Sequence, residues 1–241
     1  MSTFLKKQNR NVTDSSMAGD RKLVIAIDGP AGSGKSTVSR LVARSLKALY
    51  IDTGAMYRAL TLKAMRMRLN LQDETALARL ARETEIDLKE SSGALKVSLD
   101  GEDVAGLIRT PELTKNVKYI ARVPGVRHEM VRLQRAIGRR RGAVLEGRDI
   151  GTVVFPDAGY KFYLDADPVE RARRRHKELV EAGQVVALEE IRKDVVARDE
   201  SDMTRSVGAL KRAPDAIYVD TTNLTIQEAV EKVLSYIERT T

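Results

Sequence analysis

The sequence contains no cysteine among its 241 residues. A chain without cysteine has no disulfide framework, no thiol nucleophile and no thiolate metal site. This composition is typical of proteins in a reducing compartment, so we expect a cytoplasmic location. Histidine is also scarce: His128 and His176 each lie among charged residues without a third ligand nearby, which favours surface positions over metal or acid–base roles.

Long apolar runs are missing as well. No stretch approaches the roughly 18 to 20 apolar residues that span a bilayer, and residues 1–20 lack the apolar core of a secretory signal. We therefore expect no membrane partner. Residues 1–20 also have few apolar side chains and no periodicity, which predicts a disordered N-terminal tail before a single folded domain at 21–241.

Acidic charge is in deficit, because 42 lysines and arginines face 34 aspartates and glutamates, a formal net charge of +8. Such a balance favours phosphate-bearing or polyanionic partners, and by itself it does not distinguish a nucleotide from a nucleic acid. The tail carries only Lys6, Lys7 and Arg10, too few basic residues to predict a nucleic-acid-binding arm. We expect no nucleic-acid partner.

Short apolar runs alternate with segments of helical period along much of the chain. A helix is predicted from Lys35, with apolar residues three to four positions apart as far as Leu49, and a second over 53–69. The predicted buried strands are 22–28, 49–51 ending at Asp52, 143–146, 160–166 and 216–220. Strands that alternate with helices predict an α/β fold with a five-stranded parallel sheet flanked by helices.

Two segments interrupt this alternation and predict additional lobes. Within about 83–142, Leu95, Val97 and Leu99 alternate with polar residues, as in a half-exposed antiparallel strand. The other segment, about 171–207, is dense in arginine and poor in glycine. We expect the first to be inserted into the main fold and the second to cover it.

A glycine-rich loop follows the first predicted strand. Gly29, Gly34, Lys35 and Ser36 match the pattern G-x-x-x-x-G-K-[ST] between a strand and a helix, which is the context this motif requires. Glycine lets successive N–H groups point at phosphate oxygens, and the following helix adds its positive end. The pattern predicts a nucleoside triphosphate site in which Lys35 reaches the β and γ phosphates and the Ser36 hydroxyl ligates Mg²⁺.

The remaining sequence separates the classes of protein that use such a loop. The N-K-x-D motif usual in GTPases is absent, whereas kinases of small molecules need arginines that neutralise the migrating charge. Several candidates are present: Arg58, Arg127, Arg148, Arg171, Arg174, Arg198 and Arg205. In a chain this basic, any single arginine is more often a solvated surface residue. A kinase of a small acceptor is therefore the expectation at this point, and a P-loop protein that binds nucleic acid, which only the net charge favours, is the alternative.

Longer motifs carry a resemblance to a known family. The runs "IAIDGPAGSGKST", "YIDTGAMYRALT", "GEDVAGLIRT", "EGRDIGTVVFPDA" and "ARDESDMTR" lie in order between residues 25 and 205, and together they resemble the bacterial cytidylate kinases, a family of nucleoside monophosphate kinases. The resemblance implies a P-loop kinase with an acceptor-binding lobe at about 83–142 and a lid at about 171–207. It also implies a monomer that transfers the γ-phosphoryl group of ATP to CMP or dCMP with Mg²⁺. A kinase of another small acceptor, such as UMP or shikimate, is the alternative.

The resemblance also implies roles for individual residues. ATP would be bound by the loop residues Gly29, Pro30, Ala31, Gly32, Ser33, Gly34, Lys35, Ser36 and Thr37, with Arg171 and Arg174 as lid arginines. Substrate-binding residues would be Asp52, Thr53, Tyr57, Arg58, Arg127, Arg148, Asp149, Arg198, Asp202 and Arg205. The catalytic set would be Lys35, Arg148, Arg198 and Arg205.

Within the acceptor set, the resemblance implies a division of labour. Arg58 and Arg148 would bind the α-phosphate, and Arg127 and Asp149 the cytosine edge. Arg198 and Asp202 would bind the sugar side, with Arg205 reaching toward the transferred phosphate. Cytosine presents an amino donor beside ring acceptors, so one carboxylate and one cationic donor suit its recognition.

Three positions leave questions that the sequence does not answer. Asp52 either holds a magnesium-bound water or caps the helix that follows it. Thr53 stands where many family members have serine, which keeps the hydroxyl. Lys118 stands where a small hydroxyl residue is expected near the base, so that contact is in doubt, and the lysine can equally point to solvent.

Overall fold

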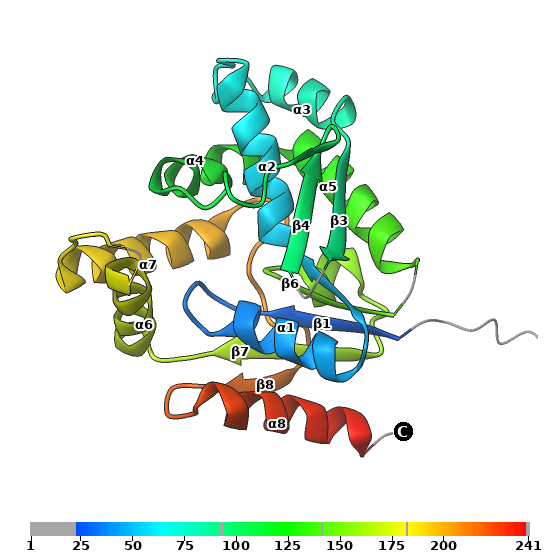
Figure 1. Cartoon of the computed structure of the whole chain (residues 1–241), viewed down its shortest axis with the longest axis vertical. Helices are drawn as coiled ribbons and strands as arrows, with labels where there is room; N and C mark the ends of the chain where they lie inside the picture. Colours follow the sequence, from blue (N-terminus) through cyan, green and yellow to red (C-terminus); the bar gives the residue numbers. More distant parts are fainter. Residues whose placement is uncertain (1–22, 92–93, 141, 182, 240–241) are drawn as a thin grey trace, which may run out of the picture.

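The computed structural model describes residues 23–91, 94–140, 142–181 and 183–239 (Figure 1). The tail predicted for residues 1–20 lies outside these ranges. None of the helices in the described ranges is long and apolar enough to cross a membrane.

A five-stranded sheet of parallel strands forms the centre of the molecule, as the sequence predicts. Its strands, in spatial order, are β2 (Leu49–Asp52), β6 (Ala143–Gly147), β1 (Val24–Asp28), β7 (Tyr160–Asp165) and β8 (Ile217–Asp220). Every neighbouring pair is parallel. The predicted strands agree with these bounds to within two residues, because short apolar runs between turn-forming residues are a strong local signal for buried strands.

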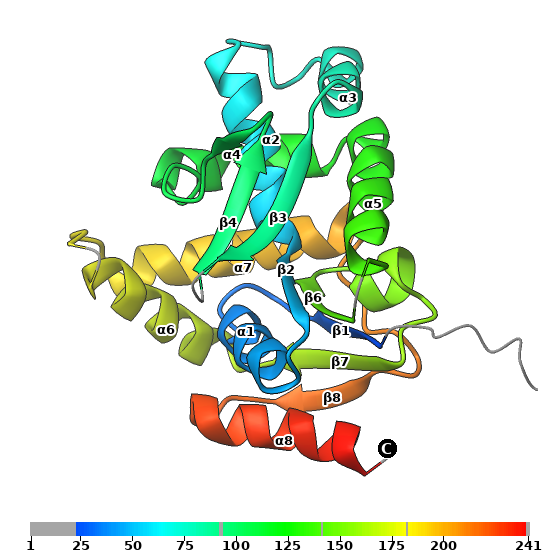
Figure 2. The ribbon, with the colours of Figure 1, turned by 45° about the vertical axis from the view of Figure 1, so that its right-hand side comes forward.

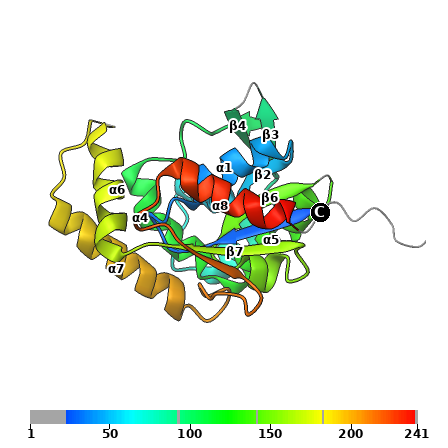
Figure 3. The ribbon, with the colours of Figure 1, turned by 90° about the horizontal axis from the view of Figure 1, so that it is seen from below.

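Alternate residues of these strands face two separate cores. On one face, Ala26, Ile51 and Leu145 pack with helices α2 (Thr53–Arg66) and α5 (Pro124–Gly138). On the other face, their strand neighbours pack with α1 (Lys35–Ser45) and α8 (Ile226–Glu238), which contact each other, and α8 lies in the foreground of Figure 3. The sheet is therefore covered by helices on both faces.

The first helix is shorter than its apolar spacing predicts. Helix α1 ends at Ser45, and Leu49 begins strand β2 rather than extending the helix. Between them Lys47 adopts a positive φ of 51°, which ends the helical conformation. The second predicted helix likewise stops at Arg66, before residue 69.

A second, antiparallel layer rises above the main sheet in Figure 1. It contains β3 (Ile86–Ser91), β4 (Ala94–Leu99) and β5 (Glu102–Asp103), together with α3 (Glu74–Arg82) and α4 (Pro111–Ala121). Strand β4 is the antiparallel strand that the alternation at Leu95–Leu99 predicts. Its partner β3 was not predicted.

Two helices form a hairpin at one side of the molecule, α6 (Pro168–Glu181) and α7 (Leu188–Thr204), seen on the left in Figures 1 and 2. They hold each other through a small core of Ala172, Ile191 and Val195. The hairpin contains most of the arginine-rich segment 171–207.

The carboxyl ends of the parallel strands meet along one edge of the sheet. Open α/β sheets bind ligands at this edge, where neighbouring strands continue in opposite directions. The phosphate loop, the start of α2 and the Arg148–Asp149 pair all follow strands here. A cavity of about 250 Å³, lined by Leu23, Ala48 and Gly142 among others, lies at the opposite edge and away from these residues.

Candidate active site

The phosphate loop connects β1 to α1 and closely approaches the end of β7. A Cβ on Gly29 would lie 2.0 Å from the carbonyl oxygen of Leu164, so only glycine fits there. Gly34 has a φ of 84° and forms the N-cap of α1, a conformation that glycine adopts without strain. The loop thus brings the amino end of α1 to the edge of the sheet, as phosphate binding requires.

Lys35 begins α1 and is buried. Its Nζ donates a hydrogen bond to the carbonyl oxygen of Pro30, 2.7 Å away. Burial lowers the pKa of Lys35, the nearby Arg148 guanidinium lowers it further, and the carboxylate of Glu146 opposes both. The ammonium is therefore held among other cations without an ion pair to a described residue.

Glu146 at the end of β6 joins the phosphate loop to the neighbouring strand, and the sequence analysis did not single it out. Its carboxylate accepts hydrogen bonds from the hydroxyls of Ser36, at 2.7 Å, and Tyr50, at 2.5 Å. Burial raises the pKa of Glu146, and the charge of Asp52 raises it further. Its place at the carboxyl end of a strand that lies beside the strand leading into the glycine loop is the signal that could have identified it.

Asp52 combines helix capping with charge pairing. Its Oδ1 accepts a hydrogen bond from the backbone N–H of Ala55 at 2.8 Å, so it caps α2. Its Oδ2 accepts from Arg58 at 3.0 Å and from Arg109 at 3.1 Å. The structure confirms the helix cap, one of the two roles that the sequence left open, and the magnesium-bound water stays a prediction. Arg109 lies in the quoted run "GEDVAGLIRT", but only the folded chain brings it to Asp52.

Arg148 follows β6 and pairs with helix α7 of the hairpin. Its Nε donates to Asp202 at 2.6 Å, and Arg205 binds the other oxygen of the same carboxylate. Burial by itself would lower the pKa of Arg148, but the Asp202 charge raises it overall. Although burial favours a neutral Asp202, the two guanidiniums hold the pKa of its carboxyl below the usual range.

Arg198 on α7 differs from these paired arginines. It makes no hydrogen bond or salt bridge with any residue in the described ranges. Burial lowers its pKa to about 10, the nearby Arg148 adds to this effect, and Asp202 partly opposes it. Arg198, Arg148 and Lys35 thus bring three cations together at the mouth of the phosphate loop, where Arg198 and Lys35 lack a paired anion.

Asp149 and Arg127 form a buried ion pair deeper in the site. The Arg127 guanidinium also lies 5.7 Å from the ring centre of Tyr57, whose pKa burial raises to about 12. The Nε of Arg127 has no hydrogen-bond partner among the residues that the structure describes. Gly208 lies directly against this guanidinium, since a Cβ there would be 1.9 Å from Nη2. The chain that follows α7 therefore covers the pair.

Arg171 and Arg174, for which the sequence predicts contact with ATP, are bound to protein groups. Arg171 is buried, donates to the carbonyl oxygens of Ala31 and Ala166 at 3.1 and 2.9 Å, and forms a 2.6 Å ion pair with Asp199. It therefore braces the phosphate loop against the hairpin. Direct contact between Arg171 and ATP stays a prediction.

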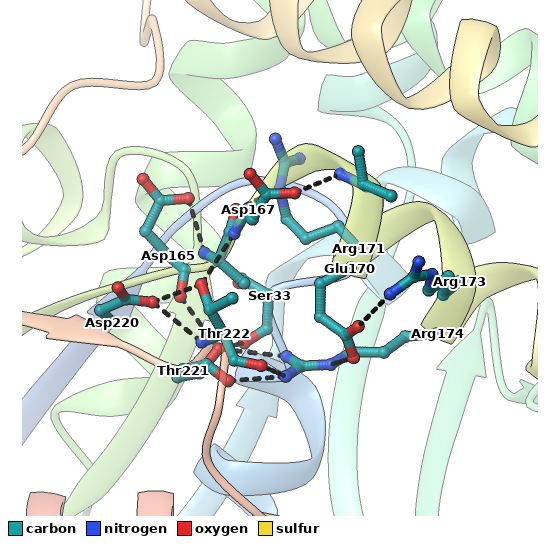
Figure 4. Close-up of polar contacts among 12 residues, drawn as sticks. Ser33, Asp165, Asp167, Glu170, Arg171, Arg173, Arg174, Asp220, Thr221 and Thr222 are labelled. Atoms are coloured by element: carbon teal, nitrogen blue, oxygen red, sulfur yellow. Dashed lines mark hydrogen bonds and ion pairs between the residues drawn. The ribbon is translucent and has the colours of Figure 1, made fainter.

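Arg174 sits one helical turn further along α6, as Figure 4 shows. It donates to the carbonyl oxygens of Thr221 and Thr222 at 2.6 and 3.2 Å, and pairs with Glu170. The Thr221 hydroxyl also lies 3.1 Å from the carbonyl oxygen of Ser33 in the phosphate loop. These contacts join α6, the end of β8 and the loop at one place.

Comparison with known proteins gives this site its context. Residues 25–239 match the family model described as Cytidylate kinase. The chain belongs to the cytidylate kinase family. It is therefore a kinase, as the motifs imply.

Curated members of the family are similar over nearly the whole chain. The cytidylate kinase of Desulforamulus reducens is 50% identical over 215 residues, which cover 89% of this chain and 96% of that protein. The cytidylate kinase of Pelotomaculum thermopropionicum is 49% identical over 214 residues, covering 88% and 95%. That of Desulfitobacterium hafniense is 50% identical over 215 residues, covering 89% and 92%.

Two departures from the family pattern have simple structural descriptions. The Thr53 hydroxyl donates to the carbonyl oxygen of Glu146 at 2.7 Å, so it holds the start of α2 to β6. Lys118 is exposed on α4, with its Nζ 5.1 Å from the ring centre of Tyr119.

The histidines fit the surface prediction only in part. His128 is exposed, as expected, but His176 is half-buried, with Nε2 3.0 Å from the carbonyl oxygen of Val186. Within the described ranges, no group of three or more acidic, histidine or cysteine side chains could hold a metal ion by itself.

Proposed function

We propose that this protein transfers the γ-phosphoryl group of ATP to CMP and dCMP. Membership of the cytidylate kinase family and identities near 50% support CMP as the acceptor. The observation that carries the chemistry is the group of buried Lys35 and the half-buried Arg148 and Arg198, whose charges converge on the phosphate loop and in which Arg198 has no partner among the described residues. Cations gathered in this way are stabilised by an anion, and a transferring phosphoryl group is one.

The donor is bound by the loop Gly29–Gly34 and the amino end of α1. The loop N–H groups and the helix end supply fixed positive potential, and Lys35 adds a full charge at the β and γ phosphates. Arg148 and Arg198 neutralise charge on the migrating group from the acceptor side. Catalysis is then a matter of positioning and charge neutralisation.

The acceptor needs no general base. The second pKa of a phosphate monoester is about 6, so the attacking oxygen of CMP is already largely ionised at neutral pH. Arg58, released from part of its Asp52 pairing, binds the α-phosphate together with Arg148, and Arg109 is a third candidate beside them. Asp149 and Arg127 read the amino and ring acceptor groups of cytosine, while Arg198, Asp202 and Arg205 face the sugar and the transferred phosphate.

Magnesium fits the residues around the loop. The Ser36 hydroxyl is exposed and the Glu146 carboxylate lies directly behind it, and such oxygen groups are the ligands that Mg²⁺ prefers. We propose that Ser36 binds the ion and that Glu146 orients the Ser36 hydroxyl. Bound Mg²⁺ neutralises charge on the β and γ phosphates. Asp52 lies close enough to Glu146 to raise its pKa and adds negative potential for the cation.

The lobes have their own roles in this proposal. The layer at about 83–142 holds the acceptor, and the hairpin within about 171–207 acts as the lid that excludes water. Arg171 joins the lid to the phosphate loop, and Arg174 joins it to the loop after β8. ATP bound at the phosphate loop would therefore lie next to the base of the lid. We also propose that the protein acts as a monomer in the cytoplasm, without nucleic-acid or membrane partners.

A coupled assay across acceptors tests the proposal. With ATP and Mg²⁺, CMP and dCMP are expected to support turnover with kcat/KM at least tenfold above UMP and with no turnover of shikimate. Preferred turnover of UMP or shikimate would identify another small-molecule kinase. Salt-sensitive binding of oligonucleotides without turnover of any monophosphate would instead favour a nucleic-acid-binding protein.

Replacement of Asp149 by asparagine is expected to reduce kcat/KM for CMP about ten to a hundredfold more than for UMP. A carboxylate accepts from the cytosine amino group, whereas an amide can also donate to the uracil carbonyl, and an unpaired buried polar group costs about 1–3 kcal/mol. Measuring both substrates with both enzymes decides this. Equal losses for CMP and UMP would mean that Asp149 only holds Arg127 in place.

A further inference from the structure

Asp28 is a buried carboxylate to which the proposed chemistry assigns no role. It ends β1 immediately before the phosphate loop and is 4% exposed. Its Oδ1 accepts a hydrogen bond from the backbone N–H of Ile150, and its Oδ2 accepts one from that of Gly151, both at 2.8 Å. Each oxygen of the carboxylate therefore binds a different backbone amide of the segment that follows β6.

That segment is an unusual turn with functional residues at its start. Ile150–Val154 form a short π-helix, a conformation that is rare in proteins and frequent at functional sites. Asp149 occupies the N-cap position but does not cap the turn, since its side chain pairs with Arg127. Asp28, which lies on strand β1, caps the π-helix in place of Asp149. The Asp149 carboxylate therefore stays paired with Arg127.

The other end of the π-helix is held as well. Arg135 on α5 donates from Nε to the carbonyl oxygen of Val154 at 2.7 Å and from Nη2 to that of Val153 at 2.8 Å. The turn is thus clamped at its amino end by Asp28 and at its carboxyl end by Arg135. Arg148 and Asp149 lie directly before this clamped turn, so the contacts of Asp28 fix the point from which their backbone extends.

The charged and titratable groups around Asp28 come from two neighbouring segments. Asp149 raises its pKa and Arg148 lowers it, both from the chain after β6. On β7, the aliphatic part of the Lys161 side chain packs beside Gly151, while its Nζ donates to the carbonyl oxygen of Pro156 and to the Asp215 carboxylate. The charge of Asp28 also contributes to raising the pKa of Tyr163 on the same strand. Burial is the largest influence and raises the pKa of Asp28 to about 7 despite the two amide hydrogen bonds.

We infer that Asp28 is a positioning residue that sets Arg148 and Asp149 relative to the phosphate loop. It lies next to Gly29 in the chain and binds the amides next to Asp149 in space, so one side chain connects the donor site with the acceptor site. The inference rests on the proposed function, because it assigns to Asp149 the reading of the acceptor base.

Replacement by asparagine tests this with little change of shape. The amide oxygen can still accept from one of the two N–H groups, but the amide nitrogen then faces the other N–H, donor against donor. The amino end of the π-helix must move to relieve this conflict. The loop glycines and Lys35 do not depend on that contact.

The Asp28→Asn variant is expected to raise the KM for CMP about tenfold and to lower the CMP to UMP ratio of kcat/KM several-fold, while the KM for ATP stays within about twofold. The control is Asp215→Asn, which removes an exposed carboxylate paired with Lys161 and should leave all three values unchanged. A merely structural role would lower kcat/KM for CMP and UMP in parallel. Parallel losses, or an unchanged KM for CMP, would overturn the inference.

Two measurements on the ligand-free protein keep this test independent of the proposed function. Amide exchange at Ile150 and Gly151 is expected to become faster in the variant, with Gly34 unaffected; unchanged exchange would also overturn the inference.

Since the folded-state pKa of Asp28 is raised from 3.8 to about 7, its contribution to the free energy of unfolding falls as pH rises between these values. The Tm of Asp28→Asn relative to wild type should therefore rise from pH 5 to pH 8, and a flat difference would contradict a buried carboxylate. Failure of wild type to phosphorylate CMP would refute the proposed function without affecting either result.

Discussion

Replacement of Lys35 by alanine is expected to lower kcat for CMP phosphorylation about a thousandfold while the fold is retained. Removal of one preorganised charge contact to a transferring group typically has an effect of this size. The loop backbone closes through its glycines and through the Ser33 hydroxyl, which donates to the carbonyl oxygen of Pro30 at 3.0 Å. The loop should therefore still form without the lysine. Steady-state kinetics at saturating ATP, with circular dichroism for the fold, measure this.

The matched control is Lys232→Ala, which removes an exposed lysine from α8. It should leave kcat within about twofold of wild type, since isolated surface charges contribute little. Turnover near the wild-type rate by a folded Lys35→Ala variant would contradict the assignment of the phosphate loop as the donor site.

Replacement of Arg198 by methionine is expected to have opposite effects on activity and stability. The variant loses a cation that faces the reacting phosphates, so kcat/KM for CMP should fall about a hundred to a thousandfold. The ligand-free protein, in contrast, loses a charge that burial and Arg148 both disfavour and that no described residue pairs with. Relief of about 1 kcal/mol would raise the Tm by about 2–4 °C for a chain of this size.

The control for this prediction lies on the same helix. Arg192 on α7 is 55% exposed and pairs with Glu189 across one helical turn, so Arg192→Met should change neither activity nor Tm appreciably. A lower Tm in Arg198→Met would show that Arg198 stabilises the ligand-free protein, and full activity would remove it from the catalytic set. A combination of lost activity and raised Tm is typical of residues kept for function at the expense of stability.

Local patterns made most of the fold predictable. Each of the five central strands is four to six residues long and mostly apolar, and such short apolar segments between loops can be recognised without knowing what they pack against. Strand β3 was missed because Ile86 and Leu88 are too few to establish an alternating pattern, and it is identified by its pairing with β4. The end of α1 was misplaced because Leu46 and Leu49 continue the apolar spacing past the turn at Lys47.

The residues of the candidate site also differ in how far the sequence alone could identify them. The phosphate loop is contiguous in sequence, and its glycines, lysine and serine therefore predicted a phosphate site directly. Glu146 and Arg109 went unassigned because their partners are distant in the chain, with Ser36 110 positions from Glu146 and Asp52 57 positions from Arg109. For Arg109, no neighbouring residue in the sequence indicates such a contact.

The sequence by itself determined the α/β class, the parallel sheet, the phosphate loop and the kinase family, because each depends on residues close together in the chain. The tertiary structure alone decided which charges are paired: Asp202 takes Arg148 and Arg205, Arg198 is left without a partner among the described residues, and Asp28 caps a turn from another strand. The physical reason is that an ion pair depends on distance and burial, and both are set by how strands β1 and β6 and helix α7 pack together rather than by the order of their residues.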